Sequence, residues 1–504
     1  MLAVSGSPQA WEAFLNDSGQ TGNSSWFRQF LTTRSPQAAT PSTTISSWNC
    51  DIRCCQNKAV WIPGGCILCN KQLYADHLQP LFHSCPTDEV RRLTNANVFQ
   101  KFCNSRIEQA QILEPNAFVR KINITALALL ASGLRNGVPC DIRLPHTSDD
   151  KARWMMGSNN LHLNVEFADG VKWIARIRRL NANAPPPKVR DYMITSEVAT
   201  LRFLEKTRVP APKVFDFALE KELGNRVGVG YILMEKLSGT PLNWNTAGQE
   251  HKRKVMNQVA DIYLELSRYP FDAVGSLDTP GSGHIGPMVT KLTGVDVPRC
   301  ASWREFSTRY IIHILNLIQQ REIYIQRPVD AYLVHRYLLD LIPIAARWTD
   351  GWDATSGFYL KHADEKMDHI LVDDEYTITG IIDWESAYTA PVAIAFNAPM
   401  GLLPVREFYD REDTVAGDDH VFLDILKSGE GRNFTGGLLP GRQLHRFMFC
   451  CGFDLERFWD DFETLFKGFR DSMHVDEGLG WAEWKKVALK RYLWYDEDHL
   501  FQFE

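Results

Sequence analysis

The stretch that most constrains this chain covers residues 361–385, KHADEKMDHILVDDEYTITGIIDWE. An apolar run at 370–372, a polar turn at 373–375 and a second run at 376–382, rich in β-branched residues, predict a β-hairpin. The loop entering the hairpin carries several titratable side chains, and the strand leaving it ends at Asp383. The hairpin is therefore expected to bring the carboxylates of Asp364 and Asp383 to one rim of the fold.

Two carboxylates on one rim suit a magnesium nucleotide. One carboxylate can accept the proton of an attacking hydroxyl group, while the other holds the metal ion that bridges the phosphates. We therefore interpret residues 361–385 as a phosphoryl-transfer centre. The alternative is an ordinary exposed turn that carries surface Asp and His residues.

A family resemblance rests on the same stretch. Residues 362–369, HADEKMDH, resemble the kinase catalytic loop H-R-D-x-K-x-x-N, and residues 383–385 resemble the metal-binding D-x-x of aminoglycoside phosphotransferase-like enzymes, which often read IIDWE here. The chain is most similar to the fungal branch of that superfamily. The resemblance implies an α+β, protein kinase-like fold of two lobes. It also implies an enzyme that transfers the γ-phosphate of ATP to a hydroxyl group of a small molecule.

The resemblance assigns roles within the catalytic loop. Asp364 is expected to be the catalytic base, Lys366 to offset charge near the transferred phosphoryl group, and His362 to belong to the catalytic set. Asp383 is expected to bind Mg²⁺, so ATP and Mg²⁺ are the implied cofactors.

One departure from the family pattern concerns the metal. His369 stands where the family usually has Asn, and imidazole is a poor ligand for a hard cation that prefers oxygen. Either Asp368 supplies the missing oxygen or the second metal position is weakened. The departure favours an alternative function, a catalytically inactive kinase-like scaffold that binds a partner.

The strand predicted at residues 173–177, WIARI, is similar to the kinase strand that presents a lysine to the α- and β-phosphates. Arg176 occupies the matching position, and its permanent charge and forked donors suit phosphate or carboxylate. Its expected partner is Glu197, which lies in a predicted helix whose apolar stripe leaves it free to face the strand. The alternative for Glu197 is a solvated helix charge.

Two further segments are expected to contact the nucleotide. The turn at residues 155–160, MMGSNN, could lay backbone amides and Asn side chains over phosphates, although a plain hairpin turn explains it equally well. Residues 231–242 resemble the hinge between the lobes, where backbone groups would read the adenine edge. The expected contacts in these segments are Gly157, Asn159, Met234, Glu235 and Lys236.

A segment rich in Cys and His precedes the small lobe. A CxxC pair is followed at finger-like spacing by two histidines and a further cysteine, and thiolate with imidazole is the ligand set of structural Zn²⁺. The predicted zinc ligands are Cys66, Cys69, His77, His83 and Cys85. Buried free cysteines, or a redox pair, are the alternatives. This extension is also the candidate surface for a protein partner.

Length divides the chain into more than one domain, because 504 residues exceed what one core usually holds. The predicted division is a flexible lead-in at 1–48, the Cys/His-rich segment at 49–90, a helical connector at 91–150, the small lobe at 151–240 and the large helical lobe with the catalytic loop at 241–504.

Composition narrows the partners and the location. A hydrophobic content of 44% with 23% charged residues is typical of a globular protein, and a net charge of −6 argues against a dedicated nucleic-acid surface. The amino terminus lacks the pattern of a secretory signal, and the most apolar run, residues 124–134, is too short to cross a bilayer. A cytoplasmic location without membrane contact is therefore expected.

Overall fold

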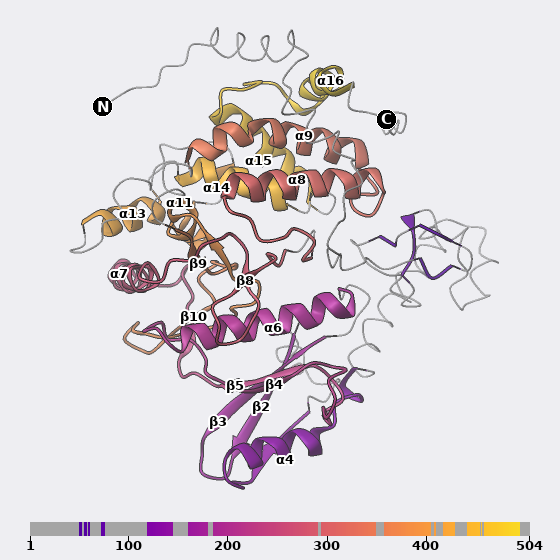
Figure 1. Ribbon diagram of the computed structural model, residues 1–504. Helices are drawn as coiled ribbons and strands as arrows, with labels where there is room; N and C mark the ends of the chain where they lie inside the picture. The colour runs from indigo at the N-terminus through magenta and orange to yellow at the C-terminus, as the bar shows by residue number, and fades with distance from the viewer. Residues whose placement is uncertain are drawn as a thin grey trace, which may run out of the picture. The chain divides into compact units, whose positions relative to one another are not determined.

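The computed structural model describes residues 50–52, 55–57, 59–60, 72–75, 118–144, 160–179, 185–290, 294–348, 357–404, 408–409, 417–428, 441–453, 455 and 458–493. Residues 118–235 build a small lobe around one sheet. Residues 240–493 build a larger, mainly helical lobe (Figure 1).

A five-stranded antiparallel sheet organises the small lobe. In spatial order its strands are β1 (Cys140–Ile142), β2 (Asn160–Phe167), β3 (Lys172–Arg178), β5 (Tyr231–Glu235) and β4 (Val214–Ala218). Gly170, in the turn between β2 and β3, has a φ of +89°, a left-handed conformation that costs glycine nothing. Strand β1, at one edge of the sheet, lies upstream of residue 151.

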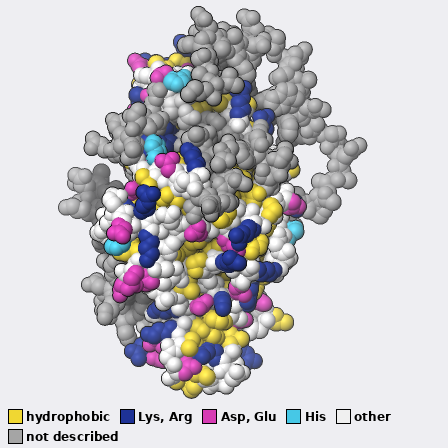
Figure 2. Space-filling model, turned by 90° about the vertical axis from the view of Figure 1, so that its left-hand side faces the viewer, with side chains coloured by type: hydrophobic (Ala, Val, Ile, Leu, Met, Phe, Trp, Pro, Cys, Tyr) yellow, Lys and Arg dark blue, Asp and Glu magenta, His cyan; other side chains and the backbone are white. Residues whose placement is uncertain are grey.

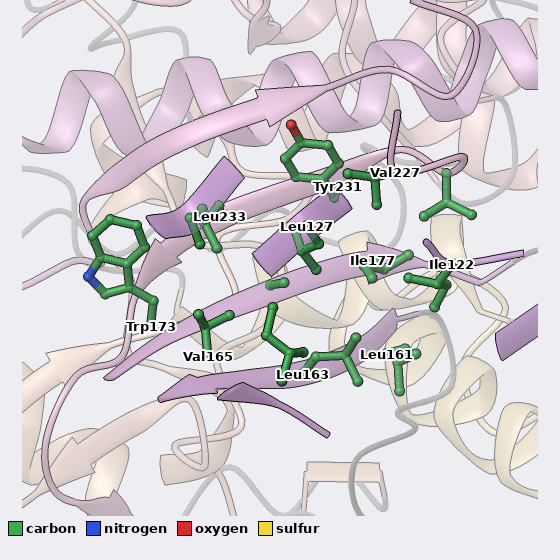
Figure 3. Close-up of a cluster of buried hydrophobic side chains, with 14 of the residues drawn as sticks. Ile122, Leu127, Leu161, Leu163, Val165, Trp173, Ile177, Val227, Tyr231 and Leu233 are labelled. Atoms are coloured by element: carbon green, nitrogen blue, oxygen red, sulfur yellow. The ribbon is translucent and has the colours of Figure 1, made fainter. Parts of the chain in front are cut away.

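The two faces of this sheet have different partners. Helix α4 (Ile124–Leu134) covers one face, where Leu127 enters a hydrophobic core with alternate residues of β2 and β3 (Figure 3). Helix α6 (Pro187–Leu204) lies on the opposite face (Figure 1). Successive side chains of a strand point to opposite faces. Ala175 and Ile177 therefore join the core under α4, while Arg176 is directed toward α6.

Short sheets and helices form the part of the larger lobe next to the small lobe. One sheet contains β6 (Thr240–Pro241), β10 (Ile370–Val372) and β11 (Ile378–Ile381), and a second pairs β9 (Tyr359–Lys361) with β12 (Tyr388–Ala390). The antiparallel pairing of β10 with β11 confirms the predicted hairpin. Helix α7 (Gln249–Leu266) packs against α13 (Asp418–Ser428).

A layer of longer helices lies beyond these sheets (Figure 1). Its members are α8 (Trp303–Gln319), α9 (Pro328–Ala345), α14 (Gly441–Gly452), α15 (Trp459–Ser472) and α16 (Trp481–Tyr492). Helix α9 packs against α8, α14 and α16 and is buried along most of its length. The remaining short elements are β7 (Ser276–Leu277), β8 (Ile285–Gly286), α11 (Val392–Ala395) and two 3₁₀ helices, Ala346–Trp348 and Met400–Leu402.

The surface carries both signs of charge. On the face drawn in Figure 2, basic and acidic side chains of the described residues are interspersed among apolar ones. Within the described part of the chain, no helix combines the length and the apolar character that a bilayer crossing needs.

Two buried histidines stabilise the helical layer in their neutral form. His335 of α9 is fully buried, with Nδ1 2.7 Å from the backbone oxygen of Ala331. His445 of α14 is buried with Nε2 3.0 Å from the backbone oxygen of Ala398. Burial lowers the pKa of His335 to about 4. Burial, reinforced by the charge of Lys361, lowers the pKa of His445 to about 3.

These pKa values predict acid sensitivity of the fold. Below the unfolded-state value of about 6.5, the unfolded chain binds protons that the folded chain does not, so the free energy of unfolding falls as pH falls. Each histidine adds up to about 1.4 kcal/mol per pH unit, between about pH 6.5 and 4 for His335. Denaturant unfolding at several pH values measures this slope.

A variant isolates one histidine. His335→Gln should flatten the slope between pH 6.5 and pH 4 by about one proton. His251→Gln, at an exposed position, controls for the loss of a histidine as such. An unchanged slope in His335→Gln would contradict the assignment.

Candidate active site

The catalytic-loop segment, residues 362–369, follows β9 and leads into the β10–β11 hairpin. Asp364 lies in this loop, and Asp383 follows the end of β11. The carboxylates of Asp364 and Asp383 are 42% and 47% exposed, so both are accessible to a bound molecule. Asp383 has a φ of +64°. This left-handed conformation is uncommon for a residue with a Cβ and persists only where the surroundings impose it.

His362 connects the segments that carry these two aspartates. Its Nε2 lies 2.9 Å from the backbone oxygen of Ile382, the residue before Asp383. Its Nδ1 accepts a hydrogen bond of 3.1 Å from the backbone N–H of Asp364. A neutral ring with its proton on Nε2 satisfies both contacts. His362 thus fixes the separation between Asp364 and Asp383.

Aromatic contacts hold the ring of His362 in this orientation. It stacks on His369, with ring centroids 4.3 Å apart, and meets Trp384 edge to face at 4.8 Å. The indole Nε1 of Trp384 donates to the backbone oxygen of Ile381 at 3.0 Å. Burial lowers the pKa of His362, which keeps the ring neutral at neutral pH.

Lys366 is paired with the expected base. Its Nζ lies 2.9 Å from Oδ2 of Asp364. This hydrogen bond raises the pKa of Lys366, so its ammonium group stays charged. Because both side chains reach solvent, the pair can separate at little cost.

The two metal candidates of the loop lie in different environments. Asp368 is exposed, whereas His369 is buried and has an Nδ1 without a hydrogen-bond partner among the described residues. His369 lines a small cavity of about 30 Å³ together with Val259 and Ile262. Burial, with the nearby His362, lowers the pKa of His369 to about 2. In the described residues, no group of three or more His, Cys, Asp or Glu side chains is arranged around a metal position.

Arg176 is the buried cation of the site. Its Nε lies 3.2 Å from Oε1 of Glu197 on α6, so the expected ion pair is present. Its NH2 group contacts Oδ1 of Asp383 at 2.6 Å and Oε2 of Glu385 at 2.8 Å. These contacts join the small lobe to the segment that follows the hairpin.

Charge and burial compete in this cluster. Burial opposes the charge of Arg176, but the carboxylates of Glu197, Asp383 and Glu385 outweigh it and raise the pKa of Arg176. Burial also raises the pKa of Glu197, to about 7, against the opposing effect of Arg176. Burial would raise the pKa of Glu385 as well, but Arg178 and Arg176 lower it to about 2. Glu385 is therefore the firmly ionised carboxylate of the cluster.

Glu385 and Arg178 of this cluster were not predicted from the sequence, and Asn160 was expected only among the Asn side chains of the phosphate turn. Glu385 also binds NH1 of Arg178, and Asn160 Nδ2 donates to its Oε2 at 2.8 Å. Arg178 could have been found, because it lies two positions after Arg176 and therefore on the same face of β3. Glu385 ends the IIDWE sequence, where only its aspartate drew attention.

His162 faces Arg176 across the β2–β3 register. Its Nε2 lies 3.4 Å from NH1 of Arg176. Burial, followed by the charge of Arg176, lowers the pKa of His162 to about 4. A neutral imidazole next to the guanidinium leaves the charge balance of the cluster to the carboxylates.

The expected hinge lies at the end of β5. Met234 is buried in the sheet, and the N–H of Glu235 donates to the backbone oxygen of Lys213 at 2.8 Å. Lys236 Nζ donates to Oδ1 of Asn164 at 2.8 Å. The following Gly239 has a φ of +100°, and a Cβ there would collide with the neighbouring hairpin. The chain crosses here from β5 of the small lobe to β6 of the larger lobe.

Several predicted residues lie outside the described residues. These are Gly157 and Asn159 of the phosphate turn and the zinc candidates Cys66, Cys69, His77, His83 and Cys85.

The class of protein follows from the fold and a family match. Residues 156–396, which include four of the five strands of the small-lobe sheet, Arg176, the catalytic loop and Asp383, match the model of the phosphotransferase enzyme family. This match covers just under half of the chain. It confirms the predicted resemblance and supports the predicted kinase-like α+β fold.

Individual proteins are similar to this chain over a short segment or at low sequence identity. Subtelomeric hrmA-associated cluster proteins of two Aspergillus fumigatus strains are 34% identical over 131 residues, which are 25% of this chain and 24% of theirs. The chain thus matches about a quarter of the length of these relatives. A thermostable mutant of aminoglycoside phosphotransferase APH(4)-Ia is 14% identical, with a TM-score of 0.40 over 70% of this chain and 100% of that chain. Macrolide 2′-phosphotransferase MphH from Brachybacterium faecium is 15% identical, with a TM-score of 0.33 over 72% and 97%.

A buried ion pair between Lys361 and Glu365 stabilises the catalytic loop. Nζ of Lys361 lies 2.7 Å from Oε2 of Glu365, and both side chains are buried. The hydroxyl of Tyr263, on α7, donates to Oε1 of Glu365 at 2.9 Å. The backbone oxygen of Glu365 accepts from Gly401 at 2.9 Å. The residue after Asp364 is thereby anchored to the larger lobe.

Breaking this pair on one side should destabilise the protein strongly. Lys361→Met leaves the carboxylate of Glu365 buried without its cation and should lower the free energy of unfolding by about 3–5 kcal/mol. The double variant Lys361→Met/Glu365→Met should recover most of that loss, because the uncompensated charge is gone. Denaturant unfolding measures both values.

The exposed pair Lys172–Glu166 provides the control. Its side chains are about half exposed, so Lys172→Met should cost about 0–1 kcal/mol. Equal losses in Lys361→Met and Lys172→Met would show that the buried pair does not support the loop.

Proposed function

We propose that this protein is an ATP-dependent phosphotransferase that transfers the γ-phosphate of ATP to a hydroxyl group of a small molecule. The observation that carries the proposal is the bridge formed by His362, which holds the Asp364 backbone and the residue before Asp383 at fixed hydrogen-bond distances. The family match over residues 156–396 supports the same reaction class.

Asp364 is suited to act as the base. Its carboxylate is accessible, and it can accept the proton of the acceptor hydroxyl as the oxygen attacks the γ-phosphorus. The bond from phosphorus to the acceptor oxygen forms, the bond to the β-phosphate oxygen breaks, and ADP leaves. Lys366, within hydrogen-bond distance of Asp364, supplies positive charge beside the transferred group.

The residues after the hairpin suit Mg²⁺. The carboxylates of Asp383 and Glu385 approach the same NH2 group of Arg176, so negative charge from both carboxylates already attracts a cation there. Mg²⁺ is usually held by one or two carboxylates together with phosphate oxygens and water. Asp383 is accessible and would hold the ion, which would neutralise charge between the phosphates. His369, with its buried ring, does not offer the oxygen donor that Mg²⁺ prefers.

Arg176 is placed to bind phosphate. Its buried position and its partner Glu197 fix the guanidinium at the inner end of the site. A guanidinium can bind phosphate oxygens through parallel N–H groups while another N–H remains on a carboxylate. The backbone of Lys236, which follows the end of β5, would contact the adenine, since the N–H of Glu235 is already bonded to Lys213.

A catalytically inactive scaffold remains the second candidate. The observation that favours it is the contact between Asp383 and Arg176, which engages the proposed metal ligand. An active enzyme must release this contact when the metal nucleotide binds, whereas a scaffold can retain it.

Nucleotide binding separates the two candidates. ATP with Mg²⁺ should raise the thermal midpoint of the wild type, since a ligand present at 100 times its Kd stabilises the native state by about 2.7 kcal/mol. Asp383→Asn should remove the part of this effect that requires Mg²⁺. No shift for the wild type with ATP and Mg²⁺ would contradict the proposed function.

Turnover then tests the base. In a screen of hydroxyl compounds with ATP, Asp364→Asn should lower transfer by roughly 10²–10⁴-fold while keeping the nucleotide-induced thermal shift. Asp374→Asn, in the exposed hairpin turn, is a matched control for the loss of a carboxylate. Wild-type turnover in Asp364→Asn would assign the proton transfer to another group.

A further inference from the structure

Glu385 holds together parts of the chain that are far apart in sequence. Its carboxylate is 13% exposed and contacts two arginines of β3 and one asparagine of β2. Oε1 accepts from NH1 of Arg178, and Oε2 accepts from both Arg176 and Asn160 at 2.8 Å. A carboxylate with this many charged and polar partners has little freedom to move.

Asp383 and Glu385 share one nitrogen of Arg176 but differ in what else holds them. Arg176 NH2 is 2.6 Å from Asp383 and 2.8 Å from Glu385. Asp383 is 47% exposed and can be solvated when it leaves the arginine. The Glu385 side chain is only 13% exposed, and Arg178 retains it. When charge enters this site, the carboxylate that leaves Arg176 at lower cost is therefore Asp383.

Resting on the proposed function, we propose that Glu385 is a positioning residue that keeps Arg176 paired while Asp383 is released to hold the metal of a magnesium nucleotide. Arg178 shares Glu385 with Arg176. The buried guanidinium then never lacks a carboxylate partner, because Glu197 remains on its Nε side and Glu385 on its NH2 side.

Neutralising Glu385 should therefore weaken metal binding specifically. In Glu385→Gln, Arg176 loses one of its anionic partners, so its attraction for Asp383 competes more strongly with Mg²⁺. The site also loses one negative charge, which lowers its attraction for the cation but favours the phosphates of a free nucleotide. In Glu385→Gln, the affinity for Mg²⁺ should therefore fall. The affinity for metal-free nucleotide should rise or stay the same.

Arg178→Gln should have the opposite effect. Without Arg178, Glu385 is free to pair more fully with Arg176, which releases Asp383 and leaves the site more negative. Affinity for Mg²⁺ should rise, and affinity for metal-free nucleotide should fall. A loss of packing alone predicts no such reversal between Glu385→Gln and Arg178→Gln.

Calorimetric titration of AMP-PNP into the full-length protein tests the proposal, with EDTA and at a series of Mg²⁺ concentrations. In Glu385→Gln, the Mg²⁺ concentration that gives half of the metal-dependent gain in affinity should rise roughly tenfold or more. The affinity for AMP-PNP in EDTA should stay equal or increase. Glu220→Gln, which removes a partly buried Arg190–Glu220 pair of the same lobe, should leave both quantities unchanged.

The outcomes distinguish a failure of the inference about Glu385 from a failure of the proposed function. Equal Mg²⁺ dependence in Glu385→Gln and the wild type, or a parallel loss of both affinities, would overturn the inference but leave the proposed function standing. If Glu385→Gln fails to fold by circular dichroism, Arg178→Gln decides alone, and weaker Mg²⁺ dependence in it would overturn the inference. A wild type that binds no AMP-PNP under any condition would refute the proposed function and the inference together.

Discussion

The buried guanidinium of Arg176 is the interaction on which the arrangement of the site depends. Removing a cation from water costs several kcal/mol unless anions replace the lost hydration. Arg176 therefore requires carboxylates, and it receives them from α6 and from the segment that follows the hairpin. This electrostatic requirement joins the small lobe to the catalytic segment of the larger lobe. Because the pairs are direct and largely buried, salt screens them only weakly.

Two neutral histidines, His362 and His369, hold the loop next to this charged cluster. His362 links the two aspartate segments through hydrogen bonds to their backbone, and its burial keeps it uncharged. His369 supports that ring by stacking. A charged imidazole at either position would disturb the balance between Arg176 and its carboxylates. His369, at the position where the resemblance predicts Asn, therefore supports the loop through its stack on His362 and lies beside a small cavity.

Sequence patterns predicted the parts of this site whose geometry is local. The resemblance to the kinase strand, together with the apolar stripe of the helix, led to the expectation of Arg176 opposite Glu197, and the turn residues were enough to expect the hairpin. The partners of Glu385 could not be predicted in this way, since Asn160 and Arg178 lie 225 and 207 positions away from it. The edge strand at Cys140–Ile142 has three residues, too few to show an alternating pattern. The orientation of His369 depends on a stack with His362, which a residue type alone does not reveal.

An arginine in place of the usual kinase lysine can bind Glu385 as an additional partner. Glu385 in turn helps to neutralise the arginine. A lysine ammonium is a compact charge that binds its partners around one nitrogen, whereas a guanidinium presents donors on separate edges of a rigid plane. In this site the Nε edge of Arg176 faces Glu197, and NH2 faces the residues after the hairpin. Three carboxylates around one ammonium would repel one another at short range. Spread over the guanidinium, with Arg178 sharing Glu385, they can coexist, and the most exposed of them, Asp383, is the one that we propose exchanges its arginine partner for a metal ion.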